Sequence, residues 1–213
     1  MAAPNSRQIN FMSSHSSLPP RIIVGISGAS GIIYGIEALH ALRELKIETH
    51  LVVSKSAAVT LSQESPLKLS ELTALADKHY SNSDIGACIA SGSYQTMGML
   101  VAPCSIKTLS EITTGVTSSL LSRAADVVLK ERRKLVLMVR ETPLHAGHLE
   151  SMLKVTNMGA IVNPPVPAFY TGPETIDDIV RQSVGRVLDL FELDSSMVKR
   201  WAGNQPRQQS GKE

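Results

Sequence analysis

Small and hydroxyl-bearing residues follow a short apolar run near the start of this chain. The run Ile22–Ile26 is typical of a buried strand, and the loop Ser27–Gly31 (SGASG) leads into a pattern that continues as a helix. We expect the first backbone N–H groups of that helix to be unpaired, and such groups bind phosphate well. The spacing of Gly25, Gly28 and Gly31 is neither that of a dinucleotide fingerprint nor that of a Walker loop. It favours a mononucleotide site, although small residues here can also serve only to pack the helix closely on a sheet.

Three later strand ends carry similar groups. They are Ser54-Lys55, Pro103–Thr108 (PCSIKT) and Arg140-Glu141. Serine and threonine at such positions can cap the following helix or hydrogen-bond a ligand, and capping alone explains any single one of them. Ligands of open parallel sheets collect at the carboxyl ends of the strands. The coincidence of four such ends therefore favours a polyhydroxylated phosphate ligand.

Positive charge is concentrated between residues 123 and 140. This segment holds six basic residues against two acidic ones, a local net charge of +4 in a chain whose formal net charge is +2. The run Arg132–Lys134 is equally typical of a solvated turn, but Arg140 ends an apolar strand at the predicted ligand edge. A guanidinium there offers a bidentate fork for phosphate, and Glu141 beside it is a carboxylate suited to proton transfer.

The C-terminal half contains weaker candidates. Asn163–Pro173 is rich in proline, so it can hold the phenol of Tyr170 over a pocket or form a packed surface turn. Arg186 lies at the edge of an apolar helix face, where its stem can pack along that face or its guanidinium can reach an anion. His145 and His148 have an i, i+3 spacing without a third ligand, so we predict surface histidines and no metal site.

The elements that must position these groups alternate along the chain. Strands are expected at 22–26, 46–54, 97–102, 134–140 and 160–163, and helices after 31 and near 55–63, 105–113, 118–131 and 145–157. Strands separated by helices imply right-handed crossovers and a parallel sheet covered on both faces. We therefore predict a three-layer α/β/α sandwich with a mainly parallel sheet, of the flavodoxin-like or Rossmann-like kind.

A last helix is the clearest of all. We expect Thr171 and Glu174 to form a capping box at its start. Its buried face is predicted to consist of Ile176, Val180, Val184, Val187, Leu188 and Phe191.

Length and composition indicate one α/β domain. The chain has 213 residues, of which 43% are hydrophobic, and no stretch approaches the roughly 20 apolar residues that cross a bilayer. Its small net charge predicts no general affinity for nucleic acid or anionic membranes. Cys88 and Cys104 suit neither a disulfide framework nor a zinc site, which predicts a reducing cytoplasm. We expect a single domain over 21–201, with tails at 1–20 and 202–213; a mitochondrial transit peptide is the alternative for the serine-rich first tail.

Five ordered blocks of this sequence resemble the UbiX family of flavin prenyltransferases. They are GISGASG, SKSA, PCSIKTLS, RAADVVLKERRKLVLMVRETPL and PPVPAFY, and the resemblance runs from about residue 21 to residue 201. Members, formerly labelled aromatic acid decarboxylases, join a dimethylallyl group from dimethylallyl monophosphate to N5 and C6 of reduced FMN. The resemblance therefore implies that this chain makes prenylated FMN, the cofactor of UbiD-type decarboxylases.

The resemblance also implies roles for individual residues. The positions that match FMN ligands are Gly28, Ala29, Ser30, Ser54, Ser105, Ile106, Lys107, Thr108 and Arg140. The positions that match residues around the prenyl phosphate are Glu64, Arg123, Lys130, Glu141, Tyr170 and Arg186. Among these, the cations and the phenol would stabilise charge on the leaving phosphate, work otherwise done by a metal ion. Glu141 would relay protons at the flavin, and Glu64 would complete the phosphate site.

Family members typically form dodecamers in which neighbouring subunits complete each site. This implies a homo-oligomer here, with a UbiD-type decarboxylase as recipient of the product. Some members have a tryptophan where alignment places Ile85, so no aromatic wall is expected at that point.

Two alternatives stay open. A flavin-dependent cysteine decarboxylase would need a catalytic histidine and a P-x-M-N-x-x-M-W clamp, neither of which is found, and a non-catalytic FMN-binding subunit would have lost the phosphate cluster.

Overall fold

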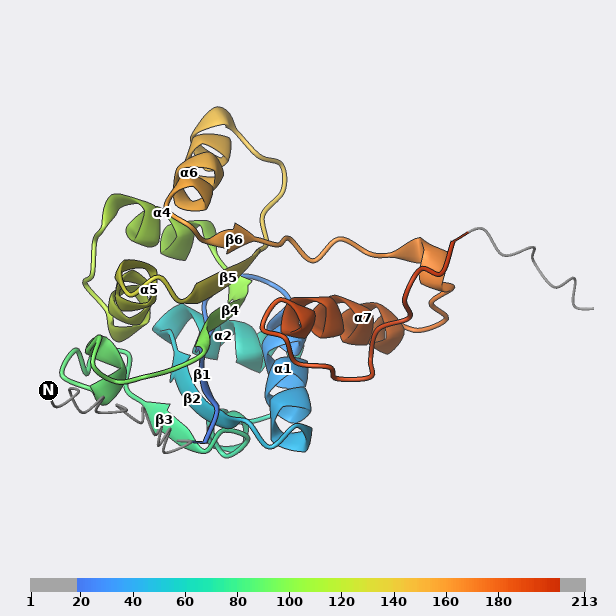
Figure 1. The fold of residues 1–213 in the computed structure, drawn as a ribbon, viewed down its shortest axis with the longest axis horizontal. Helices are drawn as coiled ribbons and strands as arrows, with labels where there is room; N and C mark the ends of the chain where they lie inside the picture. The colour runs from blue at the N-terminus through green and yellow to red at the C-terminus, as the bar shows by residue number, and fades with distance from the viewer. Residues whose placement is uncertain (1–18, 204–213) are drawn as a thin grey trace, which may run out of the picture.

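The computed structural model describes residues 19–203, and within them six strands form one sheet, all parallel (Figure 1). The strands are β1 (Arg21–Ile26), β2 (Glu48–Val53), β3 (Lys78–Tyr80), β4 (Gly98–Cys104), β5 (Lys134–Val139) and β6 (Ile161–Val162). Their order is β3-β2-β1-β4-β5-β6, the order of the classical doubly wound nucleotide-binding fold. The winding reverses between β1 and β4, and ligands of such sheets bind in the crevice at that point.

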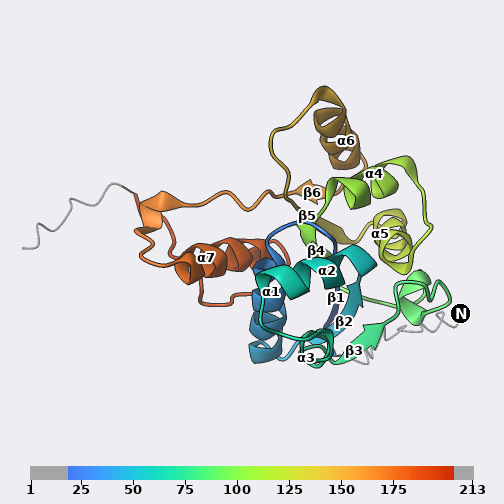
Figure 2. The same ribbon diagram turned by 180° about the vertical axis from the view of Figure 1, so that it is seen from behind.

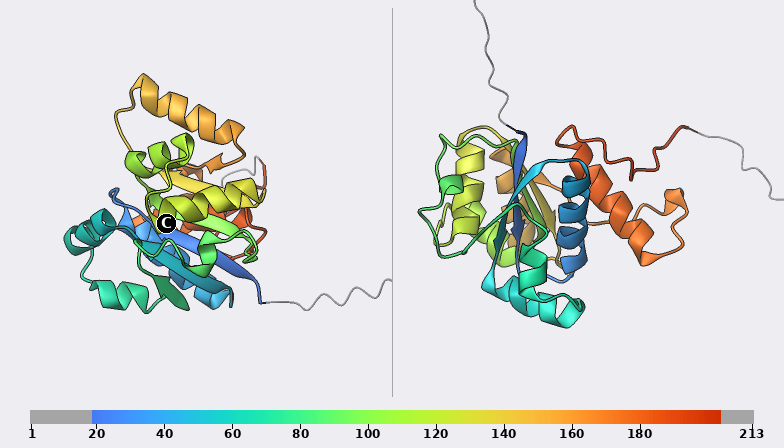
Figure 3. Two further views of the ribbon diagram at one scale, coloured as in Figure 1. Left: turned by 90° about the vertical axis from the view of Figure 1, so that its left-hand side faces the viewer. Right: turned by 90° about the horizontal axis from the view of Figure 1, so that it is seen from below.

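Helices cover both faces of this sheet, which confirms the predicted three-layer sandwich. They are α1 (Ile32–Glu44), α2 (Lys55–Glu64), α3 (Leu69–Thr73), α4 (Ile106–Thr114), α5 (Leu120–Lys130), α6 (Ala146–Asn157) and α7 (Ile176–Asp189), with 3-10 turns η1 (Cys88–Ala90) and η2 (Phe169–Thr171). Seen along the sheet, α1 and α7 lie on one side and α5 on the other (Figure 3). Helix α6 packs against α4, away from α7 (Figures 1 and 2).

The alternation of side chains along β1 shows why the strands are apolar throughout. Ile22, Val24 and Ile26 pack toward α1 and α7, whereas Ile23 packs in the second core cluster with residues of α4 and α5, and all four are at most 1% exposed. A strand buried on both faces needs apolar residues at successive positions. This is why β1, β2, β4 and β5 are recognisable in the sequence.

Two strands differ from the predictions. Edge strand β3 has three residues, none of them buried, so no apolar run marks it. Strand β4 continues through Pro103 and Cys104, beyond the expected end at 102, and all seven of its residues are buried.

The start of α7 corrects the predicted capping box. The N-cap is Thr175, whose hydroxyl accepts the Asp178 N–H (3.1 Å), while the Asp178 carboxylate accepts the Thr175 N–H (2.9 Å). Thr171 lies in η2 instead, so the box of Thr171 and Glu174 was wrong. Ile176 is 74% exposed because it opens the helix beyond the edge of the core. The other predicted face residues are confirmed, each at most 3% exposed: Val180, Val184, Val187, Leu188 and Phe191.

The predicted tails fall largely outside the described residues, as 1–18 and 204–213 are not described. Within residues 19–203, the structure contains no helix with the length and apolar character needed to cross a membrane.

Candidate functional site

Three of the predicted ligand loops meet where β1, β2 and β4 end. The link between two of them is Ser27, which is 1% exposed. Its hydroxyl donates to the Pro103 carbonyl (2.9 Å) and accepts the Ser105 N–H (2.7 Å). The Ser54 N–H donates to the Ile26 carbonyl (2.9 Å) and ties the second loop to the first. These bonds hold all three loops at one edge of the sheet.

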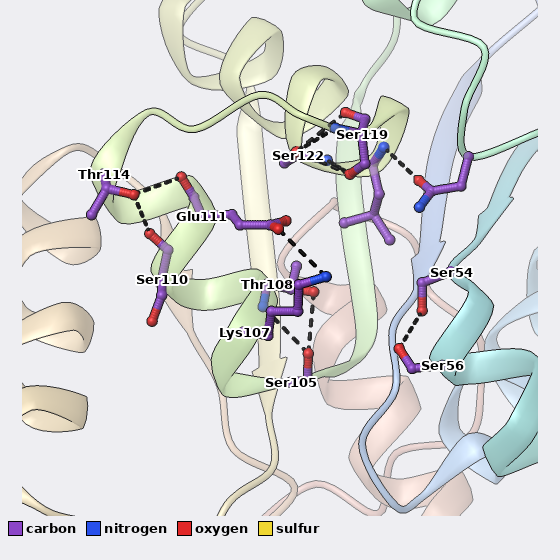
Figure 4. Close-up of polar contacts among 12 residues, drawn as sticks. Ser54, Ser56, Ser105, Lys107, Thr108, Ser110, Glu111, Thr114, Ser119 and Ser122 are labelled. Carbon is purple, nitrogen blue, oxygen red and sulfur yellow. Dashed lines mark hydrogen bonds and ion pairs between the residues drawn. The ribbon is translucent and has the colours of Figure 1, made fainter.

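Two of the predicted hydroxyl ligands also cap helices. The Ser54 hydroxyl accepts the Ala57 N–H (3.1 Å) at the start of α2. The Ser105 hydroxyl accepts the Thr108 N–H (3.3 Å) at the start of α4, as Figure 4 shows. Capping does not exclude ligand binding, because each capped helix start presents further N–H groups beside the hydroxyl.

The first loop crosses α2 at Gly28, where no side chain fits. A Cβ at this position would lie 2.3 Å from both Cβ and Oγ of Ser56. Glycine is therefore required for the first and second loops to approach this closely.

The start of α1 is bound by a carboxylate. Oε2 of Glu64, the last residue of α2, accepts the N–H groups of Gly31 (2.8 Å) and Ile32 (3.0 Å). The expectation that these N–H groups are unpaired was therefore wrong. Burial alone would raise the pKa of Glu64, but hydrogen bonds from Ser30 and the two N–H groups, with the charge of Arg140, outweigh it and lower that pKa. Glu64 is thus kept ionised between the first loop and Arg140.

A cavity of about 690 Å³ lies beside these loops, within the size range of small-molecule sites. Ser54 and Ser56 lie on one side of this region and Lys107 on the other (Figure 4). Six serine hydroxyls, an asparagine amide and two lysines suit a polyol phosphate, and valine, alanine and leucine side chains suit a planar ring. The lining residues are Val53, Ser54, Lys55, Ser56, Ala58, Leu69, His79, Ser81, Asn82, Ser83, Lys107, Ser118 and Ser119. These donors and apolar surfaces fit FMN.

Several of these lining residues were not singled out in the sequence. Segment 81–83 was assigned to no element, and Ser118-Ser119 were predicted only as the start of the helix at 118–131, because neither segment follows a strand of the predicted sheet. Asn82 is anchored at the start of α5: its carbonyl accepts the Leu120 N–H (2.8 Å) and its side chain accepts the Leu121 N–H (3.1 Å). The only available signal was the run of serines itself.

Arg140 lies where it was predicted, beside the third loop. Its N–H donates to the Cys104 carbonyl (3.0 Å), and its side chain is exposed. The next residue, Glu141, is exposed as well, and its carboxylate accepts the Thr142 N–H (3.0 Å).

The two predicted phosphate ligands of α5 are each paired with a carboxylate. Arg123 binds Asp126 (2.9 Å), and Lys130 binds Glu131 (2.5 Å). The side chains of Arg123 and Lys130 are 37% and 49% exposed. Exposed ion pairs contribute little to stability, so a phosphate can replace either carboxylate at small cost.

Tyr170 and Arg186 lie elsewhere, on η2 and α7. Tyr170 packs edge-on against Trp201, with ring centroids 5.7 Å apart, and Arg186 binds Asp189 (2.5 Å). Within residues 19–203, no hydrogen bond or ion pair joins Tyr170 or Arg186 to Lys130, Arg140 or Glu141. One chain therefore places the three predicted FMN loops at one edge of the sheet, with Ser54 and Lys107 on the cavity, but it does not unite the predicted phosphate set.

No group of three or more metal-ligating side chains gathers in the part of the chain that the structure describes. The rings of His145 and His148 lie in contact at the start of α6, tilted by 31° with centroids 3.5 Å apart, and His145 is exposed whereas His148 is half-buried.

Comparison with known proteins supplies the family. A model of the flavoprotein family matches residues 11–188. Flavin prenyltransferase UbiX of Thauera aromatica is 55% identical to this chain, over 88% of the chain and 97% of that protein. This chain belongs to the UbiX family of flavin prenyltransferases.

Solved structures of UbiX proteins have the same fold. AnUbiX (PadA1), crystallised in complex with FMN and dimethylallyl pyrophosphate, superposes with a TM-score of 0.87 at 50% identity, covering 88% of this chain and all of that one. A dodecameric FMN-dependent UbiX-like decarboxylase from Escherichia coli O157:H7 superposes with a TM-score of 0.84 at 51% identity, over 86% of this chain and all of that one. The predicted UbiX resemblance and fold class are confirmed.

The carboxylate cap on α1 of this UbiX protein generates a stability prediction. Glu64→Ala should lower the free energy of unfolding by about 1 kcal/mol at neutral pH, because α1 loses the acceptor for two N–H groups. The folded pKa of Glu64 is lowered, so this contribution is present above the ordinary value of 4.5 and is lost as the pH falls through the folded value. The free energies of unfolding of the wild type and the variant, measured with urea, should therefore become equal in acid.

The matched control is Gln63→Ala, an exposed neighbour on α2 whose replacement should change the unfolding free energy by less than about 0.5 kcal/mol. If the difference in unfolding free energy between the wild type and Glu64→Ala stayed constant from neutral pH to about pH 3, the role of the Glu64 carboxylate would be contradicted.

Proposed function

We propose that this protein joins a dimethylallyl group from dimethylallyl monophosphate to N5 and C6 of reduced FMN and releases phosphate. The observation that carries the proposal is the convergence of three hydroxyl-bearing loops at one edge of the sheet, where Ser54 and Lys107 line a cavity of the size and chemistry that FMN needs. The 55% identity to a protein named flavin prenyltransferase UbiX supports the same reaction. Prenylated FMN, the product, would pass to a UbiD-type decarboxylase.

The residues at the strand ends bind and orient the flavin. Gly28–Ser30, Ser54, Ser105–Thr108 and Arg140 are the proposed ligands, with hydroxyls and N–H groups at the phosphate and ribityl chain. FMN, when bound, supplies the ring atoms that form both new bonds. The exposed carboxylate of Glu141 adjoins Arg140, where it can accept the proton that leaves when the second bond closes the new ring.

The cationic side chains act on the other substrate. Cleavage of the carbon–oxygen bond of a prenyl phosphate leaves negative charge on the phosphate oxygens. Lys130 and Arg123, together with Arg186 and the Tyr170 hydroxyl, would stabilise that charge where other prenyltransferases use a metal ion. Glu64 would complete this site by holding the first loop against α2.

Assembly would complete the site. We place Tyr170 and Arg186 at the active site of a neighbouring subunit in a dodecamer, because neither binds to the FMN half of its own chain. The dodecameric relative from Escherichia coli O157:H7 supports this assembly. So does the segment that carries Tyr170, where Val166 and Phe169 are each 73% exposed; apolar surface of this kind marks protein contacts. We assign the enzyme to the cytoplasm, in keeping with its two free cysteines.

The test of the reaction is anaerobic incubation with reduced FMN and dimethylallyl monophosphate, followed by mass analysis of the flavin. We expect the flavin to gain the mass of one dimethylallyl group, and product to form in the presence of EDTA. Flavin recovered unchanged would refute the reaction. Activity that vanished with EDTA and returned with magnesium would show that a metal ion, rather than the cationic side chains, stabilises the leaving phosphate.

Two substitutions should separate the two new bonds. Glu141→Gln should retain FMN binding but slow closure of the ring at C6 by roughly 10²–10⁴-fold, because it removes the proton acceptor. Lys130→Ala should instead slow bond formation at N5, because it removes positive charge from the leaving phosphate. Single-turnover absorbance traces measure both steps.

The control is Glu150→Gln, which removes an exposed carboxylate on α6 and should leave both steps at the wild-type rate. Finished product formed at the wild-type rate by Glu141→Gln would remove Glu141 from the mechanism.

A further inference from the structure

Residues 194–201, here called the C-terminal strap, lie along α7 (Figure 1). Gln182 of α7, only 4% exposed, accepts the Lys199 N–H through its side-chain oxygen (2.9 Å). One turn further, a Cβ on Gly185 would lie 2.7 Å from Cγ2 of Val198. Glycine inside a helix costs about 1 kcal/mol relative to alanine, and here it allows the strap to touch the helix.

Asp189 makes the third contact between α7 and the strap. Its Oδ2 accepts from Arg186 (2.5 Å) and from Arg200 (2.9 Å), and its Oδ1 accepts a second bond from Arg200 (3.0 Å). The Asp189 side chain is 14% exposed. A carboxylate at the last residue of a helix is disfavoured by the helix dipole, so α7 itself gains nothing from it. The two guanidinium groups account for its presence.

The strap connects α7 to Tyr170. It ends at Trp201, whose ring meets the Tyr170 ring at 89° with centroids 5.7 Å apart. The Lys199 ammonium donates to the Thr171 carbonyl in the same turn (3.2 Å). Release of Arg200 from Asp189 would therefore loosen the end of the strap that carries Trp201, the partner ring of Tyr170, while Gln182 and Thr171 still hold Lys199.

We propose that Asp189 is a positioning residue for the substrate phosphate, which orients Arg186 directly and Tyr170 through Arg200 and Trp201. The inference rests on the proposed function, in which Arg186 and Tyr170 bind dimethylallyl phosphate. Asp189 shares Arg200 with Asp194, whose Oδ1 lies 3.7 Å from Nη2 of Arg200, so the four charges cancel and the phosphate would be bound by the Arg186 guanidinium itself. Arg186 bonds to Asp189 through Nη1, which leaves its other N–H groups to bind the substrate.

The variant Asp189→Asn tests this role with two readouts. Trp201 is the only tryptophan of the chain, so its fluorescence anisotropy reports the strap and should fall when Arg200 is released. The KM for dimethylallyl phosphate should rise about tenfold, as for the loss of one charge-assisted hydrogen bond, with kcat and the FMN dissociation constant much less affected. Asp189→Glu, which restores the charge, should recover part of the affinity.

Two further variants separate the two connections. Arg200→Gln changes an exposed side chain outside α7, and it should lower the anisotropy of Trp201 while raising the KM less than Asp189→Asn does. Arg181→Gln, which removes another ion pair of α7 (with Glu37, 3.1 Å), should change neither readout.

Wild-type KM in Asp189→Asn, or Trp201 anisotropy unchanged in both Asp189→Asn and Arg200→Gln, would overturn the proposal. A KM that rose equally in Arg181→Gln would do the same. A wild-type protein that formed no prenylated FMN would refute the proposed function and, with it, the substrate role of Arg186. The anisotropy, measured without substrate, would still test the docking of the strap on Asp189.

Discussion

The hydrogen bonds of one buried hydroxyl hold the candidate site together. Ser27 lies just after β1, at the point where the winding of the sheet reverses and the chain leaves β1 and β4 toward opposite faces. Its hydroxyl donates to the Pro103 carbonyl and accepts the Ser105 N–H, so the two diverging loops stay in contact. Both loops then begin helices whose N-termini face the same edge of the sheet. The hydrogen bonds of Ser27 therefore keep these two flavin loops side by side at that edge.

The rest of the site depends on charge placed around that edge. Glu64 neutralises the positive end of α1 and holds the first loop, while Arg140 extends from the end of β5 toward it. Arg123 and Lys130 of α5 are held by exposed carboxylates, and Arg186 of α7 is held by the nearly buried Asp189. The site thus has a flavin half, fixed within one chain, and phosphate ligands on separate elements.

The sequence predicts the flavin half well and the remainder less well, for physical reasons. Strands covered on both faces appear as apolar runs, and parallel topology forces their carboxyl ends to one edge, so loops such as Ser27–Gly31 and Pro103–Thr108 could be placed together without a structure. Edge strand β3 has no buried residue to mark it. The cap of α1 could not be foreseen, because Glu64 and Gly31 are 33 residues apart and meet only through tertiary packing. The sequence itself marked Tyr170 and Arg186 only as weak candidates, the family resemblance assigned them to the prenyl phosphate, and one chain does not unite them with Lys130.

The most direct test of this account is the affinity of Ser27→Ala for FMN, measured by flavin fluorescence titration. Ser27 is buried, so the substitution removes no surface group but breaks the bond to Pro103 and leaves the Ser105 N–H without its acceptor. The account predicts an FMN dissociation constant raised about tenfold or more, against no change in Ser70→Ala, an exposed serine on α3. A folded Ser27→Ala protein that binds FMN as tightly as the wild type would contradict it.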